Sequence, residues 1–298
     1  MAVLEVLGLC KRFGEKQVLS DLSFSVGEHS IFGFIGKNGA GKTTTMKAIL
    51  GLLRPDSGQI RVLGERVQYG EAPTNRHIGY LPDVPAFYPY MSAPEYLTFC
   101  GQITGLEHKE IRARVPALLE RVGLAGEGHR IGGFSRGMKQ RLGIASALIH
   151  RPRLLICDEP TSALDPIGRS EILDVLLAVK EEATVIFSTH ILADVERIAT
   201  DIALLDGGKI RLAGALPEIK ALHRRDEYRL VLENATDAAL LLSAFPAMRR
   251  DGAALDFCAE ECDPAAVLSL LAERRIPFLG LTRAEPTLET LFCEVVRT

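Results

Sequence analysis

The sequence predicts an α/β fold over residues 1–213, followed by a small α+β domain over residues 214–298. An uninterrupted apolar run, Ile31–Ile35, leads into a glycine-rich loop and a helix-forming segment, as expected of a strand covered on both faces in a parallel sheet. A strand-helix-strand unit follows between residues 154 and 187. The last part has the element order βαββαβ, which is typical of a ferredoxin-like sandwich.

Length and composition are those of a folded chain. The 298 residues, 47% hydrophobic and 24% charged, leave room for two domains and exclude disordered and low-complexity classes. The 35 basic residues nearly balance 38 acidic ones, so no overall positive charge favours nucleic acid as a partner. No apolar run approaches the length of a membrane-spanning helix and no signal peptide is recognisable, so any membrane contact is expected through a partner.

The six cysteines are scattered, which is typical of a protein of the reducing cytosol. Only Cys258 and Cys262 lie close together, and their spacing matches no standard zinc pattern. Buried thiols are expected there, with a metal or redox pair as the alternative.

Antiparallel strands are predicted near the N-terminus and a helical subdomain over about residues 84–150. Leu22, Phe24 and Val26 alternate with serines, and residues 60–62 repeat this pattern after a turn at 55–58. Ser92 followed by Glu95, with a proline between them, is a capping-box start. Apolar residues at helical spacing then predict a second helix that stops at Gly123, and these are Ile111, Val115, Leu118, Leu119 and Val122.

The remaining elements follow from the same patterns. Residues 206–209, Asp-Gly-Gly-Lys, predict a hairpin, and residues 214–217, Gly-Ala-Leu-Pro, predict the domain boundary. In the second domain, strands are predicted at 228–232, 255–258 and 278–281, and helices at 236–244, from 263 and from 287.

Residues 36–43, Gly-Lys-Asn-Gly-Ala-Gly-Lys-Thr, match the phosphate-binding loop pattern in its required place between a strand and a helix. The glycines let backbone N–H groups turn toward phosphates, and the helix adds its positive end. Lys42 is expected to reach the β- and γ-phosphates, and Thr43 to offer its hydroxyl to magnesium. The predicted nucleotide ligands of this segment are Gly36, Asn38, Gly39, Gly41, Lys42, Thr43 and Thr44.

Two carboxylates follow the apolar strand Leu154–Cys157, at the carboxyl edge of the predicted parallel sheet. Asp158 is expected to hold magnesium through water, and Glu159 to orient or deprotonate the attacking water. Together with the phosphate loop, this pair indicates nucleotide hydrolysis.

Residues 134–141, Phe-Ser-Arg-Gly-Met-Lys-Gln-Arg, resemble the signature sequence of ATP-binding cassette (ABC) proteins and precede the Asp-Glu-Pro strand as they do there. The resemblance covers residues 1 to about 214. Residues 162–165, Ser-Ala-Leu-Asp, are similar to the family's loop after the catalytic glutamate, and residues 188–190, Ser-Thr-His, to its switch histidine. Phe13 is similar to the aromatic that stacks on adenine.

The resemblance implies a P-loop NTPase fold of the ABC cassette type and a head-to-tail dimer that holds two ATP molecules. Each ATP lies between the phosphate loop of one chain and the signature of the other, so that Ser135, Gly137 and Asp165 are implied nucleotide-site residues. Ser135 also precedes a helix-forming segment and is expected to add an anion-binding helix end; an ordinary helix cap is the other interpretation. His190 is implied to contact the γ-phosphate, acting with Lys42 and Glu159 in catalysis.

Three positions depart from the family pattern. Asp83 stands where the family usually places a glutamine that touches magnesium and water, so the implied metal set is Thr43, Asp158 and Asp83. Arg136 replaces the first signature glycine and Met138 the usual glutamine, whereas Gly137 is kept.

Within the family, the sequence resembles most the ATPase subunits of ABC-2-type transporters, many of which are drug exporters. This implies ATP and Mg²⁺ as ligands, a separate transmembrane subunit, a homodimer or a paralogous ATPase partner, and no nucleic acid. The implied location is cytoplasmic, peripheral on the inner face of the membrane. The aromatic residues of segment 86–90 either dock the membrane subunit or pack within the helical subdomain.

Two other functions fit the sequence less well. ABC ATPases that act on ribosomes resemble two fused cassettes and those that act on DNA carry long coiled coils, whereas this chain has one phosphate loop and no sustained heptads before Ser135. A module that binds ATP without hydrolysis would not need Glu159 and His190.

Residues 214–298 are predicted to be regulatory or to stabilise the dimer, because every residue assigned to ATP chemistry precedes them. Residues 285–289, Glu-Pro-Thr-Leu-Glu, are similar to a motif near the end of many ABC-2-type ATPase subunits. Leu288, Leu291, Phe292 and Val295 share one helical face, which packs on its own sheet or on a partner chain.

Overall fold

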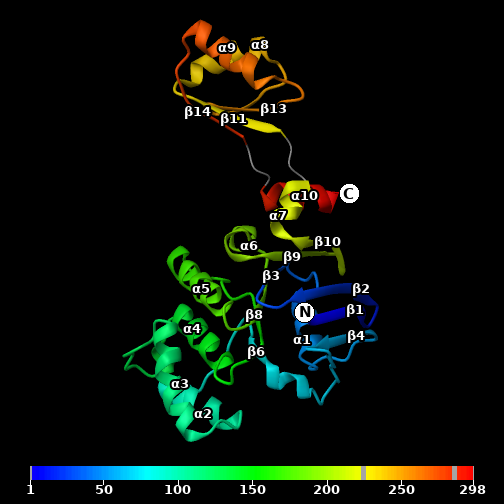
Figure 1. Cartoon of the computed structure of the whole chain (residues 1–298), viewed down its shortest axis with the longest axis vertical. Coiled ribbons are helices and arrows are strands. Elements are labelled where there is room, and N and C mark those ends of the chain that lie inside the picture. Colours follow the sequence, from blue (N-terminus) through cyan, green and yellow to red (C-terminus); the bar gives the residue numbers. More distant parts are fainter. Residues whose placement is uncertain (1, 223–225, 284–286, 298) are drawn as a thin grey trace. The chain divides into compact units, whose positions relative to one another are not determined.

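The computed structural model describes residues 2–222, 226–283 and 287–297 (Figure 1). It has two compact units, which divide between Leu216 and Pro217; residues 295–298 group with the first. The predicted boundary segment 214–217 is regular, because it contains the end of strand β10 and the start of helix α7 (Leu216–Leu222). The two units are described separately.

A six-stranded sheet of order β10-β9-β3-β8-β7-β6 forms the centre of the first unit. Its strands are β3 (Ile31–Ile35), β6 (Ile78–Leu81), β7 (Leu154–Asp158), β8 (Thr184–Thr189), β9 (Asp201–Asp206) and β10 (Lys209–Ala215). All neighbours pair in parallel except the edge strand β10, which turns back on β9 through the expected Gly207-Gly208 hairpin. Every residue of β3, β7 and β8 is buried, as the apolar runs predicted.

A second, antiparallel sheet has the order β2-β1-β4-β5. Its strands are β1 (Ala2–Phe13), β2 (Lys16–Gly27), β4 (Ser57–Val62) and β5 (Glu65–Arg66). Leu22 and Val26 are buried, and Phe24 stacks on Phe32 and Phe34 of β3 with ring centroids 5.5 and 5.4 Å apart. The two sheets and helix α1 (Lys42–Ile49) therefore share one hydrophobic core.

The helical subdomain matches the sequence patterns closely. Ser92 and Glu95 form the predicted capping box, and the second helix ends at Arg121, just before Gly123 with its positive φ of 65°. The helices of the first unit after α1 are η1 (Pro73–His77), α2 (Ala93–Ile103), α3 (His108–Arg121), η2 (Ile131–Gly133), α4 (Arg136–Ala147), α5 (Pro166–Val179) and α6 (Leu192–Ile198). None of the helices in the described ranges is long and apolar enough to cross a membrane.

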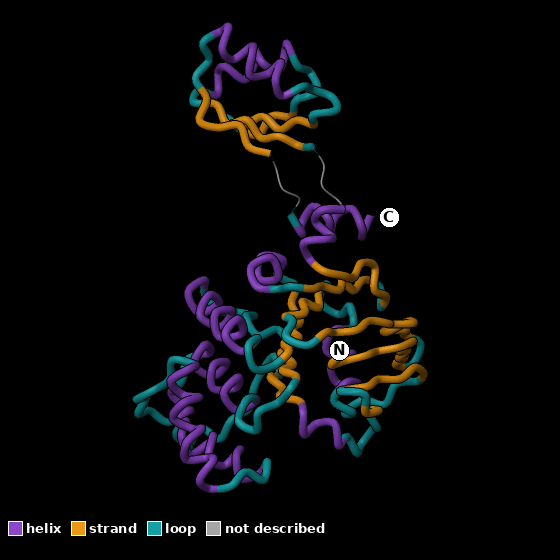
Figure 2. Tube along the Cα trace, in the orientation of Figure 1, coloured by secondary structure: helices purple, strands orange, loops and turns teal. Residues whose placement is uncertain are grey.

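The second unit has a four-stranded antiparallel sheet of order β12-β13-β11-β14, the ferredoxin-like arrangement of βαββαβ. Helices α8 and α9 cover one face of this sheet (Figure 2). After α7, its elements are β11 (Glu227–Leu232), η3 (Ala235–Asp237), α8 (Ala238–Ala244), β12 (Arg249–Asp251), β13 (Ala254–Cys258), α9 (Pro264–Arg274), β14 (Phe278–Arg283) and the part of α10 (Leu288–Arg297) before residue 295. Leu230, Leu255 and Val267 are fully buried in its separate core.

Two predictions for this unit concern its terminal helix and its cysteines. Residues 285 and 286 of the proposed terminal motif lie outside the described residues, while Leu288 and Leu291 of its helical face are buried. Cys258 and Cys262 are free thiols; Cys262 is buried as expected, whereas Cys258 is only half-buried, and no cluster of metal-ligating side chains occurs among the described residues.

Candidate functional site

The phosphate loop connects the end of β3 to the start of α1, where glycine is required by the backbone. Gly39 and Gly41 have positive φ values of 81° and 114°, a region that other L-residues rarely adopt. A Cβ on Gly36 would lie 2.7 Å from the carbonyl oxygen of Leu205. The loop therefore brings its backbone close to β9 without a side chain between them.

Lys42 and Glu159 form a buried ion pair at the carboxyl edge of the central sheet. The Nζ atom of Lys42 lies 2.9 Å from Oε1 of Glu159, and the two side chains are only 6% and 12% exposed. Lys42 also donates a hydrogen bond to the carbonyl oxygen of Gly36, with 2.7 Å between the atoms. Nδ1 of His190 lies 2.9 Å from the other carboxylate oxygen of Glu159. Glu159 thus bridges a lysine of the phosphate loop and the histidine that follows β8.

The backbone of Glu159 is held in an uncommon conformation. Its φ is 49°, in the left-handed region, where a residue other than glycine is strained. Its N–H donates to the hydroxyl and to the carbonyl oxygen of Ser188, at 3.0 and 3.1 Å. Ser188 in turn donates its hydroxyl proton to Oδ1 of Asp158, at 2.5 Å. One serine therefore fixes both carboxylate residues.

Asp158 and Thr43 have oxygen donors that suit magnesium. Asp158 is 2% exposed, and no lysine, arginine or histidine of the described residues forms an ion pair with it. A buried carboxylate without a cationic partner is stabilised by a nearby metal ion. Thr43 is exposed at the first turn of α1.

Burial, together with the negative charge of Asp158, raises the pKa of Tyr80 to about 12, which keeps that phenol protonated.

The signature segment forms the N-terminus of α4. Ser135 accepts a hydrogen bond from the backbone N–H of Met138 at 3.2 Å, so it caps the helix, and both Ser135 and its neighbour Arg136 are exposed. Asp165 has the same capping role at α5, where it accepts from the N–H of Gly168 at 3.3 Å. Phe13 is 48% exposed at the end of β1.

The structure brings the predicted site residues together only in part. Direct contacts join Lys42, Glu159 and His190, and Ser188 connects Asp158 to them. Ser135, Gly137 and Asp165 lie on helix ends outside this group. Asp83 accepts a hydrogen bond from the hydroxyl of Ser162 at 2.9 Å and lies 3.8 Å from a guanidinium nitrogen of Arg136.

Sequence reasoning assigned no role to Ser188 or to Asp194. The parallel register pairs Asp158 with Ser188, which is the signal that could have identified the serine. Asp194, 2% exposed on α6, accepts from Thr161 and from Arg169, both at 2.6 Å. It ties the turn after Glu159 to α5 and α6, and no local pattern in the sequence predicts this contact.

The aromatic segment 86–90 is divided between packing and exposure. Phe87 packs edge-on against Tyr96 of α2, with ring centroids 5.0 Å apart, whereas Tyr88 and Tyr90 are 45% and 62% exposed. Tyr88 also contacts Phe99 at 5.7 Å. Phe87 is therefore part of the helical subdomain, and the two tyrosines remain available to a partner.

Comparison with known proteins identifies similar chains. A family model described as ABC transporter matches residues 19–162. The bacitracin transport ATP-binding protein BcrA of Bacillus licheniformis is 39% identical, over 78% of this chain and 74% of its own. The linearmycin resistance ATP-binding protein LnrL of Bacillus subtilis is 34% identical, over 97% of each chain. A solved structure of an ATP binding subunit of an ABC transporter is 34% identical, with a TM-score of 0.65 over 74% of this chain and 92% of its own.

Proposed function

The chain belongs to the family of ABC transporter ATP-binding proteins and is an ATPase, and we propose that it works as a head-to-tail dimer that drives export through a separate transmembrane subunit. The observation that carries the proposal is the contact of Glu159 with both Lys42 and His190 at the edge of the central sheet. The residues proposed as the general base, the phosphate-binding lysine and the γ-phosphate contact thus share one group of ion pairs and hydrogen bonds, which supports the proposal.

Glu159 is proposed as the base that accepts the proton of the attacking water. In the structure its carboxylate faces Lys42 at 2.9 Å, so arriving phosphates compete with it for the lysine. Once the lysine turns to the β- and γ-phosphates, the carboxylate is free to face the water. His190, 2.9 Å from the same carboxylate, is positioned to donate to the γ-phosphate.

Magnesium is proposed as the ion that accompanies ATP and offsets part of its phosphate charge. Thr43 and Asp158 would hold it, since both offer oxygen donors next to the phosphate loop. Ser188 fixes the orientation of Asp158 through its 2.5 Å hydrogen bond. The backbone N–H groups of the loop, with Asn38 and Thr44, would surround the phosphates.

Ser135 and Gly137 are proposed to act on the nucleotide of a second chain, either another copy or a paralogue. Ser135 is exposed and ends a helix whose N-terminal N–H groups attract anions. A Cβ on Gly137 would meet nothing closer than 3.9 Å, so its backbone can be approached by phosphate. Phe13 would stack on the adenine, and Asp165 would belong to the interface between the chains.

The transmembrane partner is proposed to dock beside the exposed Tyr88 and Tyr90, which places the chain on the cytoplasmic face of the membrane. Export is supported by the relatives, one of which is named for bacitracin transport and another for linearmycin resistance.

The test is the Glu159→Gln variant, assayed with the parent chain for ATP binding and hydrolysis. The amide keeps the shape of the side chain but cannot accept a proton, so turnover should fall by roughly 10²-fold or more while ATP still binds. ATP should also trap a stable dimer of this variant. Turnover within a few-fold of the parent would remove Glu159 from the catalytic role.

A further inference from the structure

Three segments that are distant in sequence meet at Asp83. Ser162, in the turn after Glu159, donates its hydroxyl proton to Oδ1 of Asp83 at 2.9 Å. Arg136, the first residue of α4, donates from Nη2 to the same hydroxyl oxygen at 3.1 Å and lies 3.8 Å from Oδ1 of Asp83. The hydroxyl thus bridges an arginine and a carboxylate of opposite charge.

Each member of this triad is attached to an element of the candidate site. The N–H of Ser162 donates to the carbonyl oxygen of Glu159 at 3.1 Å. Gln140, buried on α4, donates its side-chain amide to the carbonyl oxygen of Asp83 at 3.0 Å. Arg136 directly follows Ser135. A continuous series of contacts therefore runs from Lys42 through Glu159, Ser162 and the triad to Ser135.

Asp83 and Arg136 carry opposite charges, and Arg136 lies at a helix position that does not favour a cation. A cation at the first turn of a helix opposes the positive end of the helix dipole, so Arg136 is unfavourable for α4 by itself. Asp83 offsets this charge from the loop after β6. Asp83 and Arg136 are also two of the positions at which the sequence departs from the ABC pattern. The negative charge at one position balances the positive charge at the other.

We propose that Asp83 and Arg136 are a pair of positioning residues for hydrolysis. Through Ser162 they fix the N-terminal end of α4, with Ser135, relative to Glu159 of the same chain, and Asp83 does not serve as a metal ligand. The proposal rests on the proposed function, because Ser135 matters to hydrolysis only if it reaches a bound nucleotide.

The test is a double-mutant cycle in the full-length chain. Asp83→Ala and Arg136→Ala should each lower kcat by roughly three- to ten-fold, and the double variant should be no worse than either single variant. The exchanged pair Asp83→Arg with Arg136→Asp restores opposite charges and should recover part of kcat, and the rest should stay lost because a carboxylate beside Ser135 repels the phosphates of the partner's ATP. The Mg²⁺ concentration for half-maximal activity should stay unchanged in all four.

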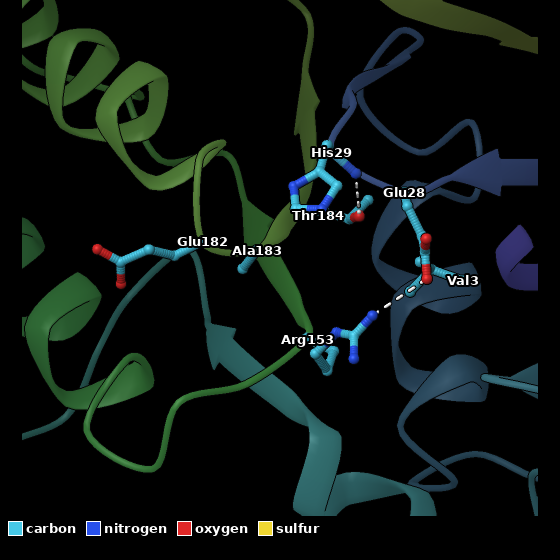
Figure 3. A pocket seen from close by; sticks show the side chains of 7 residues that line it. All are labelled: Val3, Glu28, His29, Arg153, Glu182, Ala183 and Thr184. Atoms are coloured by element: carbon cyan, nitrogen blue, oxygen red, sulfur yellow. Dashed lines mark hydrogen bonds and ion pairs between the residues drawn. The ribbon is translucent and has the colours of Figure 1, made fainter. Parts of the chain in front are cut away.

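Thermal unfolding separates positioning from general stability. Arg136→Ala removes an unfavourable cation from the start of α4 but also loses the contacts with Asp83 and Ser162, so its Tm should stay close to that of the parent although kcat falls. A matched control is the ion pair of Glu28 and Arg153, 3.1 Å apart with side chains 32% and 56% exposed (Figure 3). This pair lines a cavity of about 10 Å³ at the amino ends of β7 and β8, away from the site, and its alanine variants should leave kcat unchanged.

Each remaining outcome decides against the proposal. Additive losses in kcat, or a raised Mg²⁺ requirement confined to Asp83→Ala, would show that the two residues act separately and that Asp83 is a metal ligand. If kcat falls only together with Tm in every variant, the pair is merely structural. If the parent chain shows no hydrolysis that depends on Glu159, the proposed function fails as well, so the two failures are distinguishable.

Discussion

Lys42 and Glu159 neutralise each other in the structure. Their Nζ and Oε1 atoms are 2.9 Å apart, and both side chains are almost completely buried. A buried pair leaves an uncompensated charge when one partner is removed, so neither residue is independent of the other. Under the proposed function ATP binds the same lysine, so its phosphates would displace the carboxylate of Glu159. We therefore expect ATP binding and the release of the Glu159 carboxylate to be coupled.

The first prediction follows from this competition. Glu159→Gln should bind ATP more tightly than the parent, by roughly three- to ten-fold, because Lys42 no longer has to leave a carboxylate. The measurement is an equilibrium titration with ATP in the absence of turnover. Glu182→Gln is the matched control, since Glu182 pairs with Arg121 at 2.7 Å on the surface, 66% exposed. Equal or weaker ATP affinity in Glu159→Gln would mean that the ion pair does not limit binding.

The second prediction concerns the arrangement of two chains. In a heterodimer of a Lys42→Ala chain with a Ser135→Arg chain, both changes fall on one composite site if Ser135 acts across the interface. The other site then stays intact and should bind one ATP per dimer. The control places both changes on one chain and pairs it with the parent, which damages both sites. If instead the first heterodimer has both sites damaged and the control heterodimer binds one ATP, Ser135 acts on the nucleotide of its own chain.

How far the sequence predicts this molecule depends on the range of the contacts. The capping box at Ser92 and Glu95 and the cap at Ser135 are formed within one helical turn, and both are present as the local pattern predicts. The buried strands likewise follow from apolar runs. Such features need only a few neighbouring residues to specify them.

The triad of Asp83, Ser162 and Arg136 could not be predicted in this way. Its three residues come from separate segments, and each alone is an ordinary surface residue. The packing of α4 against β6 brings Arg136 near Asp83, and Ser162 comes from the turn after β7, the strand that pairs with β6. The sequence therefore identified Asp83 and Arg136 as unusual, but their pairing depends on tertiary structure.

The third prediction uses the half-buried His150, which follows α4. Its Nε2 lies 3.1 Å from the carbonyl oxygen of Ile78. Partial burial lowers the pKa of His150; the hydrogen bond with Ile78 opposes this shift, and the nearby charges of Arg114 and His77 add to it. The unfolded chain, with an ordinary pKa of about 6.5, then binds the proton more readily than the folded chain. The contribution of His150 to stability is therefore complete above about pH 6.5 and decreases as the pH falls through the lowered pKa.

The measurement is chemical unfolding of the parent and of His150→Gln between pH 7.5 and pH 5. The free energy of unfolding should decrease less on acidification in the variant, because glutamine does not take up a proton. Gln102→Asn, on the exposed end of α2, changes no titratable group and should keep the pH dependence of the parent. Identical pH profiles for the parent and His150→Gln would contradict the assignment.

The last prediction is that the second unit is not needed to bind ATP, although we propose that it supports dimerisation or the response to the membrane subunit. Lys42, Glu159 and His190 all belong to the first unit, and the second unit has a separate core. A chain that ends after Leu222 should therefore bind ATP and Mg²⁺ within about two-fold of the full chain while losing affinity for its partner.

The exact end of that shortened chain matters. Ending at Ala213 would remove the pairs of Gly214 and Ala215 with β9, and also the hydrogen bond of 2.9 Å from the N–H of Leu216 to the carbonyl oxygen of Thr200. The shorter chain should therefore have a lower Tm than the chain that ends at Leu222, since an edge strand loses part of its pairing. Nucleotide titration of both chains, with circular dichroism to confirm folding, gives the answer. A folded chain ending at Leu222 that fails to bind ATP would show that the second unit helps to build the nucleotide site.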